Sequence, residues 1–188
     1  MAKTTGLQQI ILTYEDYVHL PDDGKRYEIL EGEVFVTPAP KTKHQIISLN
    51  LAVVLQQHVR KHKLGRVLTA PTDVILSRTN VLQPDLLFLS NERLRYLSEK
   101  NVQGAPDLVV EILSEFTEDQ DRTAKRQLYA RYGVRVYWLI DPDAETLEAY
   151  ELDPAKRSFR HNATYHGSDG VQSALFPKLK LKLQELWL

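Results

Sequence analysis

Three short runs of apolar residues limit what this chain can fold into. They read VLQPDLLFL (residues 81–89), DLVVEIL (107–113) and VRVYWLI (134–140). None alternates between apolar and polar side chains as a strand with one solvated face does, so each indicates a strand buried on both faces. A segment with helical spacing, residues 118–132, separates the second run from the third and ends before Gly133. Strand, helix and strand in this order predict a right-handed crossover between two parallel strands.

The rest of the chain supplies helices and strands around these runs. Residues 13–21 predict a short helix, and RYEILEGEVFVTPAP predicts a hairpin that turns at Glu31 and Gly32. Two strands, residues 66–70 and 73–77, are separated by Pro71, and residues 147–188 predict one or two strands and a short tail. Residues 42–63 predict a long amphipathic helix with a wide apolar face of Ile46, Ile47, Leu49, Leu51, Val53, Val54 and Leu55.

These elements predict the fold class. We expect a single α/β (α+β) domain over residues 1–188, in which helices flank a mixed central sheet and the N-terminal hairpin is an addition. An apolar share of 43% is enough to bury a sizeable core in a domain of this size.

Composition and charge exclude several classes of function. The chain has no cysteine, which rules out disulfides, zinc–thiolate sites and thiol catalysis. Its net charge of -1 is not that of a protein that coats nucleic acid, so any DNA contact must come from a local patch. The N-terminal apolar run is too short for a signal peptide or a membrane span, and we expect a cytoplasmic protein with no membrane partner. One basic segment either contacts a phosphate backbone or is a solvated helix end; it comprises Lys41, Lys43, Arg60, Lys61, Lys63 and Arg66.

Two of the apolar runs contain an acid, Asp85 in the first and Glu111 in the second. A buried carboxylate is costly without a partner, and a hard cation between two carboxylates lowers that cost. The pattern therefore predicts a divalent-metal site, with the alternative that both acids lie at strand ends and face water. Asp107 competes for the role of first ligand, but it shares a strand with Glu111 and lies about 13 Å from it. One Mg2+ cannot bridge that gap, so we assign Asp107 to the start of the strand.

Lys125 is the third residue of interest. On the helix of residues 118–132 it shares a face with Leu128, Tyr129 and Tyr132, which is the face turned toward the sheet. From there its ammonium could reach the carboxylates and stabilise charge that develops on a phosphate. The alternative is an ordinary surface pair with Asp121, four residues earlier on the helix.

Six blocks of the sequence together resemble a large bacterial family of restriction-endonuclease-like proteins in the PD-(D/E)XK superfamily. They are RYEILEGEVF, TKHQIISLNL, QPDLLFL, DLVVEILS, DRTAKRQLYARYGV and YWLIDP, in this order, between about residues 14 and 150. The resemblance implies a nuclease-like fold in which Asp85 is the aspartate of the PD element and Glu111 is the (D/E). The lysine of the motif would fall at Leu113, but similar proteins carry it on the next helix, where this chain has Lys125.

The same resemblance adds Glu28 and His44 to the catalytic candidates. Glu28 would orient a metal-bound water, and His44, at the start of the long helix, would reach the same cleft. From the residues alone, Glu28 could equally pair across its hairpin, and His44 could have no role as a ligand. This chain also departs from its relatives at Val136, where they often carry an acid. A further histidine pair, His58 and His62, lacks a third ligand and is assigned to a solvated helix face.

These observations give one hypothesis and two alternatives. The chain is expected to be a metal-dependent endonuclease acting on DNA, with Asp85, Glu111 and the backbone carbonyl of Ile112 holding Mg2+ (or Mn2+) and Lys125 assisting electrostatically. Cutting a duplex usually needs two active sites, so we expect a homodimer. The alternatives are a nuclease-fold module that binds or regulates a partner without catalysis, and a metal-dependent hydrolase of a non-nucleic substrate. The metal hypothesis also predicts that the two acids lie on adjacent strands with their carboxylates within about 5 Å of each other. Their like charges should raise the pKa of at least one of them in the metal-free protein.

Overall fold

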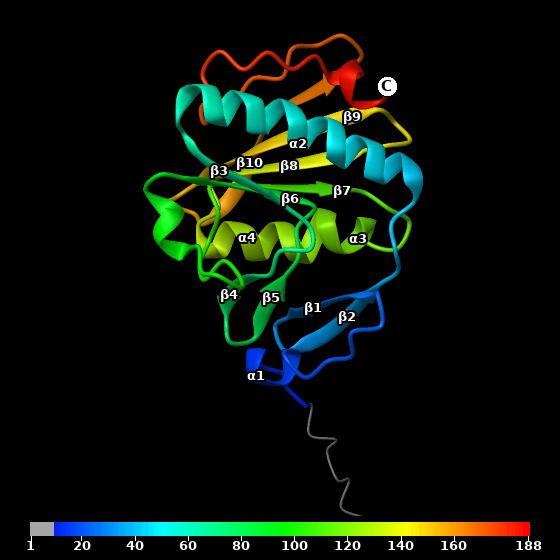
Figure 1. The fold of residues 1–188 in the computed structure, drawn as a ribbon, viewed down its shortest axis with the longest axis vertical. Coiled ribbons are helices and arrows are strands. Elements are labelled where there is room, and N and C mark those ends of the chain that lie inside the picture. Colours follow the sequence, from blue (N-terminus) through cyan, green and yellow to red (C-terminus); the bar gives the residue numbers. More distant parts are fainter. Residues whose placement is uncertain (1–9) are drawn as a thin grey trace, which may run out of the picture.

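The computed structural model describes residues 10–188 and arranges them as two β-sheets with helices packed against them (Figure 1). The larger sheet has the strand order β10-β9-β8-β7-β6-β3, and the smaller has the order β2-β1-β5-β4. The strands are β1 Arg26–Leu30, β2 Glu33–Thr37, β3 Gly65–Thr69, β4 Val74–Ser77, β5 Asn80–Leu82, β6 Leu86–Ser90, β7 Leu108–Ile112, β8 Val136–Asp141, β9 Thr146–Asp153 and β10 Ser158–His166. The α-helices are α1 Tyr14–Tyr17, α2 Thr42–His62, α3 Glu118–Gln120 and α4 Arg126–Tyr132, and 3-10 turns lie at Arg93–Tyr96 and Leu183–Leu186.

Part of the N-terminal segment that we expect not to be a signal peptide, residues 1–9, lies outside the described residues. Within the part that the structure describes, no helix combines the length and the apolar character needed to cross a membrane.

The predicted parallel pairing of the two strands is confirmed. β7 and β8 are parallel, with Leu108 opposite Val136 and Ile112 opposite Ile140. α4 ends at Tyr132, and the next residue, Gly133, has a φ of 89°, the left-handed conformation that commonly terminates helices. The connecting segment differs from the single α-helix that its spacing predicts, because one turn of π-helix (η2, Asp121–Lys125) separates α3 from α4. π-turns are rare and occur frequently at functional sites.

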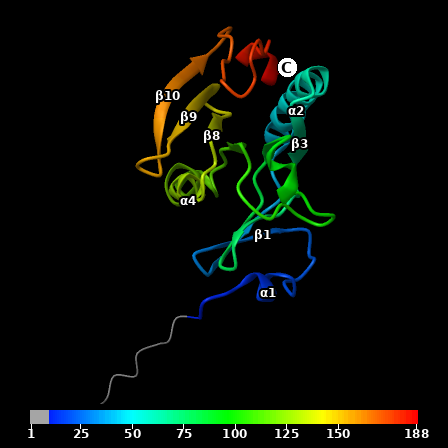
Figure 2. The same ribbon diagram turned by 90° about the vertical axis from the view of Figure 1, so that its left-hand side faces the viewer.

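The two faces of the larger sheet are covered by different helices. Val110 and Trp138 lie in one apolar cluster with α2 and the C-terminal segment, whereas Val109 and Tyr137 lie in another with α4. Because successive strand residues point to opposite faces, Glu111 is on the α4 face, like Val109. Figure 2 shows α2 and α4 on different sides of the sheet.

Helix α2 buries a narrower face than its sequence suggests. Ile47, Leu51 and Leu55 are fully buried against the sheet. Three other apolar residues expected on that face are instead exposed, at 46% for Ile46, 64% for Leu49 and 46% for Val53. The hairpin is confirmed, with β1 and β2 antiparallel around Glu31 and Gly32.

The run of residues 81–89 is not one strand, which corrects the sequence-based interpretation. It forms β5 in the smaller sheet and β6 in the larger one, with Gln83, Pro84 and Asp85 linking them. Proline cannot donate to a strand ladder, which explains the interruption. Asp85 therefore lies at the junction of the two sheets and not inside a strand.

Candidate active site

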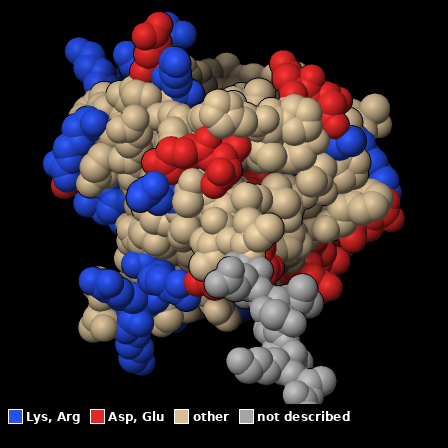
Figure 3. All heavy atoms as spheres, turned by 90° about the horizontal axis from the view of Figure 1, so that it is seen from below, with Lys and Arg blue, Asp and Glu red and all other residues tan. Residues whose placement is uncertain are grey.

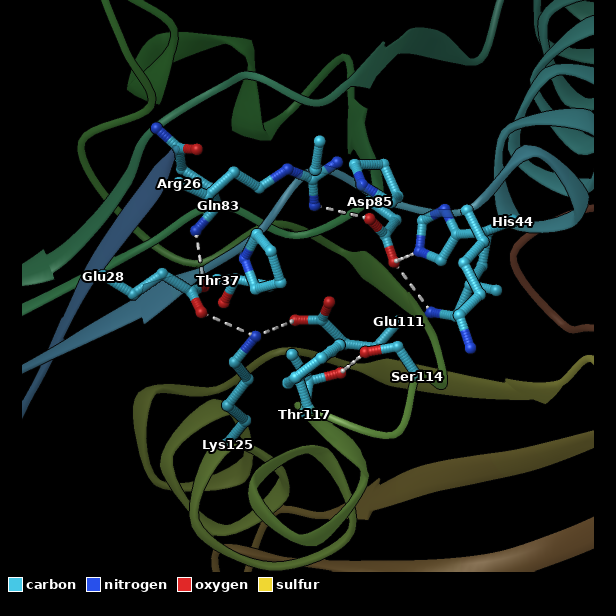
Figure 4. Close-up of a pocket in the computed structure, with 16 residues that line it drawn as sticks. Arg26, Glu28, Thr37, His44, Gln83, Asp85, Glu111, Ser114, Thr117 and Lys125 are labelled. Atoms are coloured by element: carbon cyan, nitrogen blue, oxygen red, sulfur yellow. Dashed lines mark hydrogen bonds and ion pairs between the residues drawn. The ribbon is translucent and has the colours of Figure 1, made fainter. Parts of the chain in front are cut away.

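A pocket opens at this junction of the two sheets, and the predicted site residues line it (Figure 4). The smaller sheet contributes Arg26 and Glu28 from β1, and the larger contributes Glu111 from β7. His44 enters from the first turn of α2, and Lys125 from the π-turn before α4. The remaining lining residues are Thr37, Pro38, Ala39, Pro40, Lys41, Gln83, Asp85, Ile112, Ser114, Phe116 and Thr117.

Strand register brings Asp85 and Glu111 to the same side of the sheet. β6 and β7 are antiparallel, with Leu86 opposite Val110, so the residue before Leu86 is level with the residue after Val110. The backbone N–H of Ile112 donates a hydrogen bond to Asp85 Oδ2 at 2.8 Å. This bond continues the hydrogen bonding between the two strands, with a side chain as the acceptor. Both carboxylates are 3% exposed, so the alternative of acids facing water is wrong.

Asp85 is held by three donors. Arg26 Nη1 lies 2.7 Å from Oδ1, while His44 Nε2 and the Ile112 N–H lie 3.0 and 2.8 Å from Oδ2. Burial raises the pKa of this carboxyl, but the contacts with His44 and Arg26 outweigh burial and the net pKa is lowered. These contacts favour the ionised form of Asp85, and His44 contacts the carboxylate directly, in the cleft that the resemblance implies.

Glu111 is in the opposite electrostatic situation. Tyr129 donates its hydroxyl to Glu111 Oε1 at 2.9 Å, and Lys125 Nζ lies 3.4 Å from the same oxygen. Burial raises the pKa of Glu111, Lys125 lowers it, and the nearby acids Asp121, Asp85 and Glu28 raise it again; the net pKa is well above the ordinary value. The pKa of Glu111 is therefore raised as predicted, but chiefly by burial and only in smaller part by the charge of Asp85.

Lys125 is the centre of a buried ionic cluster, and its interpretation as half of a surface pair is wrong. Its Nζ lies 2.9 Å from Glu28, 3.1 Å from Asp121 and 3.4 Å from Glu111, with only 3% of the residue exposed. Burial lowers the pKa of Lys125, but these three acids outweigh it and hold the pKa well above the ordinary value. Asp121, 1% exposed, is buried with it.

Glu28 joins the hairpin to this cluster. Its Oε1 accepts a hydrogen bond from the Gln83 N–H at 2.8 Å, and its Oε2 contacts Lys125. On the backbone Glu28 does pair across its hairpin, opposite Phe35 of β2, while its carboxylate contacts Gln83 and Lys125. Glu28 therefore holds residues 83–85, the segment that links β5 to β6 and contains Asp85, and also contacts Lys125.

Three residues of the site, Arg26, Asp121 and Tyr129, were missed as candidates by sequence reasoning. Two of them could have been identified from their spacing relative to residues that were already candidates. Arg26 is two residues before Glu28 on one strand face, and Tyr129 is four residues after Lys125 on one helix face. Asp121 also has the four-residue spacing, but the π-turn that buries it has no sequence signature that we recognise.

A family described as "Putative restriction endonuclease", Uma2, matches residues 14–184. The chain belongs to the Uma2 family. A solved structure, a "putative nuclease belonging to DUF820 from Anabaena variabilis ATCC 29413", matches with a TM-score of 0.78 at 21% identity, covering 94% of this chain and 97% of that one. This structural match confirms the predicted restriction-endonuclease-like fold. No curated protein matches the chain.

The donor set in this Uma2 member fits a divalent cation. Glu28, Asp85, Glu111 and Asp121 are four buried carboxylates that face two permanent cations, Arg26 and Lys125. If all four acids ionise, these six groups have an excess of two negative charges, which one divalent cation would neutralise. Within residues 10–188, no described residue donates a hydrogen bond to Glu111 Oε2.

The groups available to bind a metal ion are the carboxylates of Asp85 and Glu111 and the backbone carbonyl of Ile112. Among residues 10–188 no three His, Asp or Glu side chains are grouped so that all could hold one ion. Mg2+ usually takes one or two carboxylates and keeps several waters, so two are sufficient. The N–H and C=O of a strand residue point to the same neighbouring strand, and the Ile112 N–H already faces Asp85. The carbonyl of Ile112 therefore also points to the side of β7 on which Asp85 lies.

Other charged candidates lie away from the pocket. Asp107 precedes β7 at the opposite end of the strand and is buried against Arg93 and Arg135, as expected for a structural residue. His58 is buried against Phe176 and not solvated, which corrects its assignment to a solvated helix face. Val136, the departure from the family pattern, packs in the apolar core and does not line the pocket.

The basic segment is not one surface. Lys41 and Lys43 are at the start of α2, beside the pocket, whereas Arg60 and Lys61 are in its last turn. A helix of this length separates its ends by about 30 Å. The face seen in Figure 3 carries separate patches of both signs and no continuous basic band.

Proposed function

We propose that this chain is a divalent-metal-dependent endonuclease that hydrolyses DNA phosphodiester bonds. The observation that carries the proposal is the buried pair Asp85 and Glu111 at the junction of two sheets, with Lys125 in contact with Glu111. Membership of a family described as "Putative restriction endonuclease" supports nuclease chemistry on this fold. We propose that the chain acts in the cytoplasm and that its two sheets form one domain, because residues of both sheets build the site.

Each residue is proposed to have a distinct task. Asp85, Glu111 and the Ile112 carbonyl would hold Mg2+ or Mn2+, which when bound polarises the phosphate and lowers the pKa of a coordinated water. Lys125, held by three acids, would present a fixed positive charge to the phosphate as negative charge develops on it. His44 would keep the Asp85 carboxylate oriented through its Nε2 contact. Glu28 would orient Lys125 and the attacking water.

The test is a cleavage assay on plasmid, linear duplex and single-stranded DNA, with Mg2+, Mn2+ or EDTA. Cleavage is expected with either ion and not with EDTA. Absence of DNA cleavage under every divalent ion would refute the nuclease proposal and favour the partner-binding module. Hydrolysis of bis(p-nitrophenyl) phosphate without DNA cleavage would favour a hydrolase of another substrate.

We also propose a C2 homodimer that buries well above about 1,000 Å2, since cleavage of both strands of a duplex needs two sites. Ile46 and Val53, two apolar side chains exposed on α2, support an interface, because soluble monomers seldom expose apolar patches. Light scattering is expected to give a mass of about twice 21.7 kDa. A monomer at the assay concentration would count against the dimer but not against the site.

A further inference from the structure

Arg26 lies between the pocket and a second cavity. Arg26, His44 and Gln83 line both the pocket and a groove that runs outward past the loop before β1 and the first half of α2. The groove continues along Lys25, Gln45, Ser48, Leu49 and Thr69. Figure 4 shows the Arg26 side chain reaching across the pocket to Asp85. Its guanidinium is therefore at the boundary between the carboxylates and an open approach to them.

The guanidinium has unused hydrogen-bonding capacity. Arginine carries five N–H donors, and within residues 10–188 the side chain of Arg26 donates only to Asp85 Oδ1. Its side chain is 24% exposed, whereas those of Lys125 and Asp85 are each 4% exposed. Of the two cations that are paired with the buried carboxylates, Arg26 is thus the one that a ligand in the groove can reach.

We propose that Arg26 has two partners in turn: Asp85 in the metal-free chain, and the substrate phosphate once a divalent cation is bound. The inference rests on the proposed function, in which Asp85 is a metal ligand and the substrate is a phosphodiester. A dication on Asp85 and a guanidinium 2.7 Å from the same carboxylate repel each other, so they compete for it. Once displaced, the guanidinium can turn into the groove, where its coplanar N–H donors can pair with phosphate oxygens.

This arrangement predicts opposite effects of one substitution on two affinities. Arg26→Gln removes the competing cation, so Mn2+ titrated alone by calorimetry is expected to bind about 10-fold more tightly than to the wild-type chain. The same variant is expected to bind a fluorescein-labelled DNA duplex about 10-fold more weakly by anisotropy in Ca2+, with the DNA checked for integrity on a gel. Arg78→Gln is the matched control, since Arg78 forms an exposed ion pair with Glu15 away from the pocket and should change neither affinity.

The two affinities make the proposal falsifiable at separate points. A misfolded Arg26→Gln variant would lose both affinities, and thermal unfolding by circular dichroism identifies that case. Arg26→Lys, which keeps the charge, then replaces it in the experiment. This second variant should have wild-type affinity for Mn2+ but not for DNA. Unchanged or weaker Mn2+ binding by a folded Arg26→Gln chain overturns the competition, and unchanged DNA binding overturns the phosphate role. If wild-type protein cleaves no DNA, the nuclease proposal fails, whereas the Mn2+ titration still decides whether Arg26 competes with the metal.

Discussion

A Glu111→Gln variant is expected to cleave DNA at least about 1,000-fold more slowly than the wild-type chain in Mg2+. Glutamine has the shape of glutamate and can still accept the hydrogen bond from Tyr129, so the packing around β7 should persist. It lacks the negative charge, and the cation would have one anionic ligand in place of two. Initial rates on a duplex measure the loss, and calorimetry with Mn2+ should show affinity reduced about 10- to 100-fold.

The same variant has a second readout in the absence of metal. Burial raises the pKa of Glu111, so the folded chain holds a proton that the unfolded chain releases above the ordinary pKa of 4.5. The free energy of unfolding of the wild-type chain in EDTA therefore falls as the pH rises from that value toward the raised pKa. Denaturant titrations should show a smaller fall for Glu111→Gln, and Mg2+ should stabilise the variant less than the wild-type chain.

Glu185→Gln is the matched control for both readouts, because Glu185 is exposed and lies outside the pocket. It should leave the cleavage rate and the pH dependence of stability unchanged. Cleavage by Glu111→Gln within 10-fold of the wild-type rate would show that Glu111 is not a metal ligand.

The part of the site that strand and helix periodicity controls could be predicted from the sequence. Alternation along β7 places Glu111 on the face covered by α4, and helical spacing places Lys125 and Tyr129 on the side of that segment that meets it. Both periods are local properties of the chain. The residues that they bring together follow once β7 and β8 are known to be parallel neighbours.

The junction between the sheets could not be predicted in the same way. The apolar run that contains Asp85 has the composition of one strand, and only the pairing partners of β5 and β6 divide it between two sheets. Arg26 meets Asp85 because β5 pairs with β1, a contact between residues 59 apart in sequence. Burial of Asp121 likewise depends on a π-turn, since the same four-residue spacing on an exposed α-helix gives an ordinary surface pair.

A Lys125→Met variant is expected to cleave about 100-fold more slowly, the scale for removal of one preorganised electrostatic group. Methionine fills the space of the lysine stem, so the fold should be retained. Divalent binding should stay intact or become slightly tighter, because the ammonium that shares the Glu111 carboxylate is gone. This split between rate and metal affinity distinguishes Lys125 from the proposed metal ligands. Single-turnover rates and Mn2+ calorimetry measure the two quantities.

Asp121 and an exposed lysine provide the comparison. Asp121→Asn removes one of the three acids that hold the ammonium and leaves Glu28 and Glu111, so a loss of about 10-fold is expected, more than an exposed ion pair would give. Lys100→Met, at an exposed position away from the pocket, should have no effect. If Lys125→Met cleaves as fast as the wild-type chain, the lysine has no catalytic task, and the buried cluster serves only to hold the π-turn against β7. If Asp121→Asn is as slow as Lys125→Met, the position of the ammonium, and not its presence alone, controls the rate.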